Sequence, residues 1–529
     1  MPKRFNVTGL CVPEKHYMVD LTERIMQIQK MVDAGDYFII NCARQYGKTT
    51  TLAALARALH EQKLVISLDF QTLGSASFLN ENTFSLAFLF LFLREMKRQK
   101  AVNMSGIGEL IVEMQEIVSR KEEKFDLLAL FQYLLEVCER SSKPVVLIID
   151  EIDSASSNQV FLDFLAQLRG YYLERESKGT PAFQSVILAG VYDIKNLKRK
   201  LRADEEHKVN SPWNIAADFD IDMGLSENGI TGMLHAYEQD HHTGMDINKM
   251  AALLYGYTGG YPYLVSKLCR LMDEKICAAS AWTKDGFLEA VRMLLSENNT
   301  LFESLTGKLT NDPELCQMLR ELLFLGKTIT YSPSSRSVHL AIMFGFVKNE
   351  GGKVLPSNRI FDTLLYDYFL GADEMHASEI YKASIQDKNQ FFTDGHLNMR
   401  RVLQKFVEHF HELYGNCKAV FVEEEGRRYF LLYLRPIIYG AGNYYIEART
   451  RSFGRTDIIV DYHGEQFVIE TKIWRGNEYN SRGESQLAGY LDDYGLSRGY
   501  LLSFNFNQKK QIGVQELIVN GKLIIEAVV

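Results

Sequence analysis

A short loop between a predicted strand and a predicted helix has the composition of a phosphate-binding turn. The strand is expected at Tyr37–Asn41, the helix at Thr50–His60, and the loop reads CARQYGKT over residues 42–49. Backbone N–H groups at a helix start, together with the positive end of the helix dipole, hold phosphate oxygens well. In that setting Lys48 is expected to reach the β and γ phosphates of a nucleotide, and Thr49 to ligate Mg²⁺.

Two acids directly after a second apolar run supply the other half of this site. The run is Val145–Ile149, and Asp150 and Glu151 follow it. Such a run is typical of a buried central strand, and ligands bind at the carboxyl edge of open α/β sheets. Asp150 is expected to hold Mg²⁺ directly or through water, and Glu151 to orient and deprotonate the attacking water. The alternative is a strand that ends in solvated acids.

The loop departs from the GxxxxGK[ST] pattern at its first position, where Cys42 replaces glycine. A residue with a side chain must avoid positive φ there, so the loop is expected to open differently. The chain has no NKxD-like guanine-reading motif, which favours ATP over GTP. The residues expected at the nucleotide are Arg44, Gln45, Tyr46, Gly47, Lys48, Thr49, Thr50 and Asp150.

A second group of charged residues lies on a predicted hairpin near the C-terminus. His463 and Gly464 suit a two-residue turn, and pairing about that turn sets Asp457 directly opposite Glu470. Opposed Cβ atoms lie about 5 Å apart, and Lys472 projects from the same face as Glu470. The two carboxylates suit a hard divalent cation, Mg²⁺ or Mn²⁺, which can activate water and stabilise charge on a phosphate. Lys472 would position the nucleophile; the alternative is a surface hairpin of alternating charge.

Four apolar runs separated by helical stretches predict the scaffold of the first site. Continuous apolar strands are typical of a parallel sheet buried on both faces, and right-handed crossovers then give a doubly wound α/β domain over residues 1–225. Helical periodicity dominates residues 226–300. The apolar run Phe84–Leu93 is too short for a membrane span, which favours a core helix. The four runs are Tyr37–Ile40, Leu64–Phe70, Val145–Ile149 and Val186–Ala189.

Residues 301–372 have the element order of a winged helix. Residues 373–395 are polar and are predicted to be a linker. An amphipathic helix, Leu397–Tyr414, then begins a strand-rich module over residues 396–529, in which Glu423–Glu425 are expected in a turn between strands. The winged-helix elements are the helices Pro313–Leu325, Ser335–Phe344 and Arg359–Phe369 and the hairpin Phe346–Leu355, turning at Gly351 and Gly352.

Several segments of the first 270 residues resemble motifs of AAA-like and STAND-type ATPases. Residues 43–49 resemble the PRQxGKT loop of that group, which often lacks the first glycine. The resemblance implies a helical lid after the α/β core, followed by a winged helix. The resemblance does not decide which arginine is the arginine finger; the candidates are Arg169, Arg199 and Arg202. The other matching segments are Asp163–Arg169, Ser211–Asn214 and Thr258–Val265.

The C-terminal module resembles the PD-(D/E)xK nuclease superfamily over residues 396–529. Asp457 and the segment Glu470–Lys472 match its acidic and ExK motifs, and Gln486 and Tyr490 match its QxxxY helix. The arginine two residues before Asp457 matches the GRxD form of nuclease-like domains fused to AAA-like ATPases. The resemblance implies that Asp457 and Glu470 bind metal and that Lys472 and Gln486 belong to the catalytic set. Glu447 is a further candidate acid.

Bulk composition limits the partners. The 529 residues carry a formal net charge of -8, so any nucleic-acid contact must come from a local groove. Seven scattered cysteines without a CxxC pair indicate reduced thiols and a cytoplasmic protein without a membrane anchor.

Three functions are compatible with these patterns. The first is an ATP-binding and ATP-hydrolysing protein that regulates a metal-dependent DNA nuclease domain, a role that fits defence against foreign DNA. The second is a nucleotide-switched scaffold that forms homo-oligomers and does not cut. The third is a DNA-binding ATPase that reads DNA through the winged helix.

Overall fold

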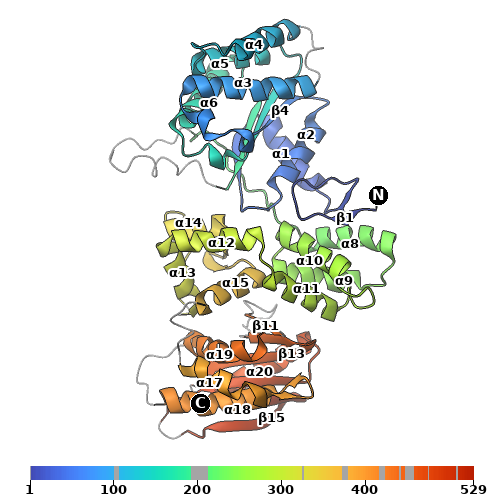
Figure 1. Cartoon of the computed structure of the whole chain (residues 1–529), viewed down its shortest axis with the longest axis vertical. Helices are drawn as coiled ribbons and strands as arrows, with labels where there is room; N and C mark the ends of the chain where they lie inside the picture. Colours follow the sequence, from blue (N-terminus) through green and yellow to red (C-terminus); the bar gives the residue numbers. More distant parts are fainter. Residues whose placement is uncertain are drawn as a thin grey trace. The chain divides into compact units, whose positions relative to one another are not determined.

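The computed structural model describes most of the chain, in two compact units. The described residues are 2–99, 106–191, 213–324, 327–371, 379–415, 423–439, 442–446, 458–474, 476–507 and 510–529. The units are Met1–Leu225 and Ser226–Val529 (Figure 1).

The first unit is built on a four-stranded parallel sheet with the order β3-β6-β5-β4. Alternate strand residues supply two separate cores: Phe38 and Ile148 pack on one side, Ile39 and Leu147 on the other. This burial of both faces confirms the predicted α/β sheet. The strands are β3 Tyr37–Asn41, β4 Leu64–Asp69, β5 Val145–Asp150 and β6 Ser185–Gly190.

Helices cover both faces of this sheet (Figure 1). The predicted core helix at Phe84–Leu93 is confirmed within α3, where Phe84, Phe88 and Phe92 are fully buried. Across the described ranges, no helix has the length and apolarity needed to cross a membrane. The helices are α1 Thr22–Ala34, α2 Lys48–Leu59, α3 Glu81–Arg98, α4 Gly108–Arg120, α5 Leu127–Arg140 and α6 Gln159–Lys178, preceded by the short strands β1 Arg4–Phe5 and β2 His16–Tyr17.

The second unit begins with helices and continues with the elements expected of a winged helix. The hairpin turns at Gly351 and Gly352, whose φ angles of 59° and 78° require glycine-like freedom. The first helices are α8 Glu227–His241, α9 Ile247–Thr258, α10 Pro262–Lys275, α11 Lys284–Ser296 and α12 Thr300–Asn311. They are followed by α13 Pro313–Phe324, α14 Arg336–Met343, β7 Val347–Glu350, β8 Lys353–Pro356 and α15 Arg359–Leu370.

The C-terminal module is a six-stranded mixed sheet with the order β11-β12-β13-β14-β16-β15. The pairs β13–β14 and β14–β16 are parallel, and the other neighbours are antiparallel. The strands are β11 Gly442–Tyr445, β12 Ile458–Tyr462, β13 Glu465–Ile473, β14 Arg498–Phe504, β15 Gly513–Val519 and β16 Lys522–Val528. The helices are α17 Glu379–Asp387, α18 Met399–Tyr414, α19 Glu423–Ile438 and α20 Asn477–Asp493, with the short strands β9 Phe392–Thr393 and β10 His396–Leu397.

Two local predictions in this module are wrong. The predicted linker 373–395 contains α17, which packs on α19 and buries Ile380 and Ala383. These two residues lie one turn apart and form an apolar stripe within a polar segment. The predicted turn at Glu423–Glu425 is instead the first turn of α19, where the helix dipole favours acidic side chains.

Gly426, in the first turns of α19, provides a test of this packing. A Cβ atom there would lie 2.4 Å from the ring of Phe504, so we expect Gly426→Ala to destabilise the module by about 1–3 kcal/mol. Gly232 in α8 is a matched control, because a Cβ atom there meets nothing within 4 Å. Gly232→Ala should be neutral or stabilising by up to about 1 kcal/mol. Urea denaturation of both variants measures the difference, and equal midpoints would contradict the α19–β14 contact.

Candidate functional site

The loop after β3 adopts a phosphate-binding conformation. Helix α2 begins at Lys48, two residues earlier than predicted, directly after Gly47 with a φ of 85°. Cys42 is not among the residues with positive φ; the other left-handed position in the loop is Gln45, with a φ of 57°. Cys42 therefore avoids positive φ, as expected of a residue with a side chain at this position.

Lys48 is buried beneath this loop. It is 6% exposed, and its Nζ donates to the carbonyls of Cys42 and Ala43, each at 3.0 Å. Neutral carbonyls are weaker acceptors than phosphate oxygens, because hydrogen bonds between charged groups are roughly twice as strong. The ammonium is thus held at the loop, and a phosphate anion would be a stronger acceptor for it than the two carbonyls.

Thr49 and Asp150 meet across the two predicted halves of the site. Thr49 Oγ1 donates to Asp150 Oδ2 at 2.7 Å, and the backbone N–H of Glu151 donates to Asp150 Oδ1 at 2.9 Å. Burial raises the pKa of Asp150, although the Thr49 hydrogen bond acts against that rise. The structure therefore brings together residues 101 positions apart in the sequence.

Glu151 adopts an unusual backbone conformation, with a φ of 56°. Left-handed non-glycine residues cost about 1–3 kcal/mol and concentrate at functional sites. Burial and the neighbouring charge of Asp150 raise the pKa of the Glu151 carboxyl. A raised pKa makes this carboxylate a better proton acceptor than an exposed glutamate.

The donor set fits Mg²⁺ and ATP together. The N-terminus of α2 and the Lys48 ammonium offer donors to phosphate, and the Thr49 hydroxyl and Asp150 carboxylate are hard oxygen ligands for Mg²⁺. Arg44 is exposed at the outside of the loop, and its charge offsets part of the rise in the pKa of Glu151. Of the arginine-finger candidates, Arg169 lies on α6, whereas Arg199 and Arg202 fall outside the described residues, as do Ser211 and Pro212.

Sequence reasoning missed the N-terminal segment, which reaches this site. The N–H of Cys11 donates to Thr50 Oγ1 at 3.2 Å, so the segment before α1 lies on the first turn of α2. The guanidinium of Arg24 donates to the carbonyl of Gly224 at 2.5 Å. A Cβ atom on Gly224 would lie 3.4 Å from the Tyr46 hydroxyl. No local motif marks these contacts, because their partners lie 39 and 200 residues apart.

The C-terminal hairpin has the predicted register. Ile458 pairs with Ile469 and Ile459 with Val468, about a turn at His463 and Gly464 with φ angles of 47° and 82°. Asp457, predicted to lie opposite Glu470, falls outside the described residues, as does Glu447. Where the structure describes the chain, no three His, Cys, Asp or Glu side chains are grouped to hold a metal ion.

The remaining predicted residues of this second site form two contacting pairs. Lys472 Nζ lies 2.8 Å from Glu470 Oε1, and Glu470 is fully buried. On α20, Gln486 Nε2 donates to the Tyr490 hydroxyl, which confirms that these two residues share a helix face. Helix α20 covers the lysine, since a Cβ atom on Gly483 would lie 3.6 Å from its Cγ and Cε atoms.

Two further acids of this sheet and its helices were missed. The carboxylate of Glu423, at the start of α19, accepts from the N–H of Ile473 at 3.3 Å. Glu526 on β16 is 2% exposed and lies two strands from Glu470 in one lateral row, with Leu501 between them. It accepts from Ser503 Oγ at 3.1 Å and from Gln515 Nε2 at 2.6 Å. The sequence signal for Glu526 was an isolated acid between apolar residues.

Helices of residues 226–370 contact this sheet within the second unit. Lys284 of α11 donates to Gln466 Oε1 at 2.8 Å, and the rings of Tyr257 and Tyr445 lie 5.2 Å apart, edge to face. On the neighbouring helix α15, Asp367 accepts from the Tyr444 hydroxyl at 2.9 Å. The sheet that carries Glu470 is therefore bonded directly to the helices that follow the first unit.

Comparison with known proteins identifies one family. The model of the family described as "AAA-like domain" matches residues 15–369 of the 529. No curated protein matches the chain. Among solved structures, the Walker-type ATPase PABY2304 of Pyrococcus abyssi is similar at 11% identity and a TM-score of 0.46, covering 68% of this chain and 99% of that chain.

Two structures from Aeropyrum pernix are also similar. The ORC2 protein in ADPNP and ADP complexes has 12% identity and a TM-score of 0.32, covering 69% of this chain and 96% of that one. The ORC1 protein in complex with DNA has 12% identity and a TM-score of 0.28, covering 66% of this chain and 93% of that one.

Proposed function

Because this chain belongs to the AAA-like domain family, we propose that its first unit binds and hydrolyses ATP with Mg²⁺. The observation that carries this proposal is the 2.7 Å hydrogen bond between Thr49 and Asp150 beside the buried Lys48. We propose in addition that the C-terminal sheet is a metal-dependent nuclease domain, that its substrate is DNA, and that the nucleotide state regulates it.

In the first unit, the proposed roles follow from the geometry. The Lys48 ammonium would exchange two loop carbonyls for β and γ phosphate oxygens. Thr49 and Asp150 would hold Mg²⁺, which when bound neutralises charge on the phosphates. Glu151 would orient the attacking water and accept its proton, a role that its raised pKa supports.

In the C-terminal sheet, the buried Glu470–Lys472 pair supports the nuclease proposal. The Glu470 carboxylate is fully buried and lies 2.8 Å from the Lys472 ammonium. Burial of such an ion pair often adds little to the free energy of unfolding, so the pair is better explained by a functional role. The sequence predicts Asp457 opposite Glu470, and this pair of carboxylates would hold the metal. Lys472 would then orient the nucleophile, and Gln486 on α20 would belong to the same catalytic set.

Regulation is supported by the bonds between the sheet and the preceding helices. A movement of α9 or α11 with the nucleotide would strain the Lys284–Gln466 and Tyr257–Tyr445 contacts. We extend the proposal to a homo-oligomer that acts against foreign DNA. A nucleotide-switched scaffold that does not cut is the competing function. The DNA-reading winged helix is less favoured, because Arg336 on α14 already pairs with Asp312 at 2.7 Å.

The Glu151→Gln variant tests the proposal. It keeps the size of the side chain and removes its basicity, so we expect Mg²⁺-ATP binding to persist and turnover to fall by about 100-fold or more. In the wild type, Glu151 with its raised pKa is protonated at a higher pH than an ordinary glutamate, so hydrolysis should fall earlier on acidification. The variant should lack this acidic limb.

The measurements are phosphate release between pH 5 and 8 and DNA cleavage in the same samples. Cleavage in Glu151→Gln with ATP should differ from cleavage in the wild type, because the variant stays in the ATP state. If turnover is unchanged, Glu151 is not the base. If turnover falls but neither protein cuts DNA with Mg²⁺ or Mn²⁺, the ATPase proposal stands and the scaffold replaces the nuclease.

A further inference from the structure

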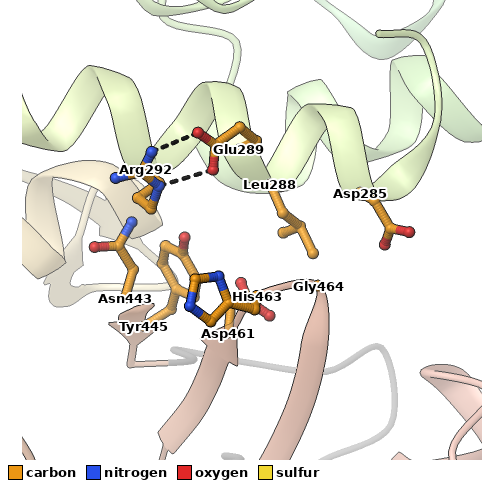
Figure 2. A pocket seen from close by; sticks show the side chains of 9 residues that line it. All are labelled: Asp285, Leu288, Glu289, Arg292, Asn443, Tyr445, Asp461, His463 and Gly464. Carbon is orange, nitrogen blue, oxygen red and sulfur yellow. Dashed lines mark hydrogen bonds and ion pairs between the residues drawn. The ribbon is translucent and has the colours of Figure 1, made fainter. Parts of the chain in front are cut away.

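A polar cavity of about 440 Å³ lies within the second unit, between α11 and the β11–β12 end of the sheet (Figure 2). Binding pockets for small molecules typically span about 300–1,000 Å³. Helix α11 contributes Asp285, Glu289 and Arg292 to its wall. The sheet contributes Tyr445 and Asp461, which lie near each other beneath the helix in Figure 2.

Three buried polar atoms at this cavity make no well-formed hydrogen bond. Asp461 is 7% exposed and Tyr445 is fully buried. Asp461 Oδ1 accepts from Gln466 Nε2 at 2.9 Å. Asp461 Oδ2, the Tyr445 hydroxyl and Asn443 Nδ2 interact with one another, but in no hydrogen bond of good geometry within the described chain. An unsatisfied buried polar group costs about 1–3 kcal/mol, and a charged one more. A bound molecule that supplies partners would recover this loss.

The charges around the cavity favour a cation. The Arg292 guanidinium is engaged by both oxygens of Glu289, at 2.7 and 2.5 Å, as the dashed lines of Figure 2 show. Asp285 and Asp461 are the remaining carboxylates of the wall, and the rim adds His463. A cation at Asp461 would meet a carboxylate, with Asp285 elsewhere on the same wall, and no unpaired arginine or lysine of the wall.

Two cations outside the wall influence Asp461 without pairing with it. The Lys284 ammonium donates to Gln466, so it reaches Asp461 only through that amide. Arg359 lies over the ring of Tyr257, 4.8 Å from its centroid. Both lower the pKa of Asp461, yet burial is the larger effect and raises that pKa to about 7. A direct contact with a cation would favour the charged carboxylate much more strongly.

We propose that this cavity binds a small organic cation, a primary amine or a guanidinium, through N–H hydrogen bonds to Asp461 and Tyr445. A metal ion fits less well, because no group of three or more His, Cys, Asp or Glu side chains within the described ranges could hold one. An N–H donor also suits the Tyr445 oxygen. A flip of the Asn443 amide, which structures rarely distinguish, would turn a further acceptor toward the ligand. Such a ligand would bridge α11 and the sheet.

Calorimetric titration of the full-length protein with 1,4-diaminobutane and with agmatine tests the proposal, with 1,4-butanediol as the neutral counterpart of the diamine. We expect a single site for at least one of the cations and no heat from the diol. Affinity should rise by about tenfold or more between pH 6 and 8, because the cation binds the ionised form of Asp461. Asp461→Asn should lose this binding and its pH dependence.

Matched variants separate the cavity from general attraction to acidic surface. Tyr445→Phe keeps the shape of the wall and should weaken binding several-fold, which covers the case in which Asp461→Asn does not fold. Asp492→Asn removes an exposed acid of α20 that pairs with Lys522, and it should change nothing. The proposal is overturned if neither cation binds at 10 mM, if Asp492→Asn weakens binding as much as Asp461→Asn does, or if Mg²⁺ displaces the amine with equal stoichiometry.

Discussion

Replacing Lys48 by alanine should abolish nucleotide binding at the first unit. Lys48 is 6% exposed, and its ammonium is held by two loop carbonyls at the position expected to face the phosphates. Loss of one partner from a buried, hydrogen-bonded charge pair typically costs about 2–5 kcal/mol. We therefore expect ATP affinity to fall by roughly 100-fold or more, and hydrolysis to become undetectable.

Titration with a fluorescent ATP analogue and a phosphate-release assay measure these two effects. Lys143→Ala is the matched control. Lys143 lies just before β5 begins, at the edge of the sheet opposite to Asp150, and its ammonium donates to the carbonyl of His60. That variant should bind ATP like the wild type. Tight ATP binding by Lys48→Ala would contradict the assignment of this loop to phosphate, whatever the C-terminal sheet does.

Local rules explain why much of this site was predictable. A parallel strand buried on both faces reads as an apolar run, so the positions of β3 and β5 followed directly from the sequence. Residues that follow parallel strands meet at one edge of the sheet, so the sequence alone predicted that Thr49 and Asp150 lie side by side. The hairpin register followed from its two-residue turn in the same way.

The missed features depend on contacts that leave no local pattern. The bond between Lys284 and Gln466 joins residues 182 positions apart, and neither residue belongs to a motif. The left-handed conformation of Gln45 has no signal either, since glutamine is not a residue that favours positive φ. The start of α19 was misread because three glutamates before a glycine suit a turn and a helix N-terminus equally well. Its burial against Phe504 decides the matter, and that contact is long-range.

The strongest test of the C-terminal module is the replacement of Lys472. Lys472→Ala should reduce DNA cleavage by about 100-fold or more, because the lysine is the group that would orient the nucleophile and stabilise charge in the transition state. It should also reduce stability, since removal of one partner from a buried ion pair costs about 3–5 kcal/mol. The 2.8 Å contact with the buried Glu470 is such a pair. Loss of cleavage alone would therefore not separate catalysis from folding.

The double variant Lys472→Ala/Glu470→Gln makes that separation. It removes both charges together, so thermal stability should recover in part, whereas cleavage should stay absent with Mg²⁺ and with Mn²⁺. Lys522→Ala is the control, because this lysine pairs with the exposed Asp492 rather than with Glu470. It should cut DNA at the wild-type rate. If cleavage returns in the double variant, the pair is structural and the nuclease site lies elsewhere; if it stays absent in a stable protein, Lys472 and Glu470 are needed for the reaction itself.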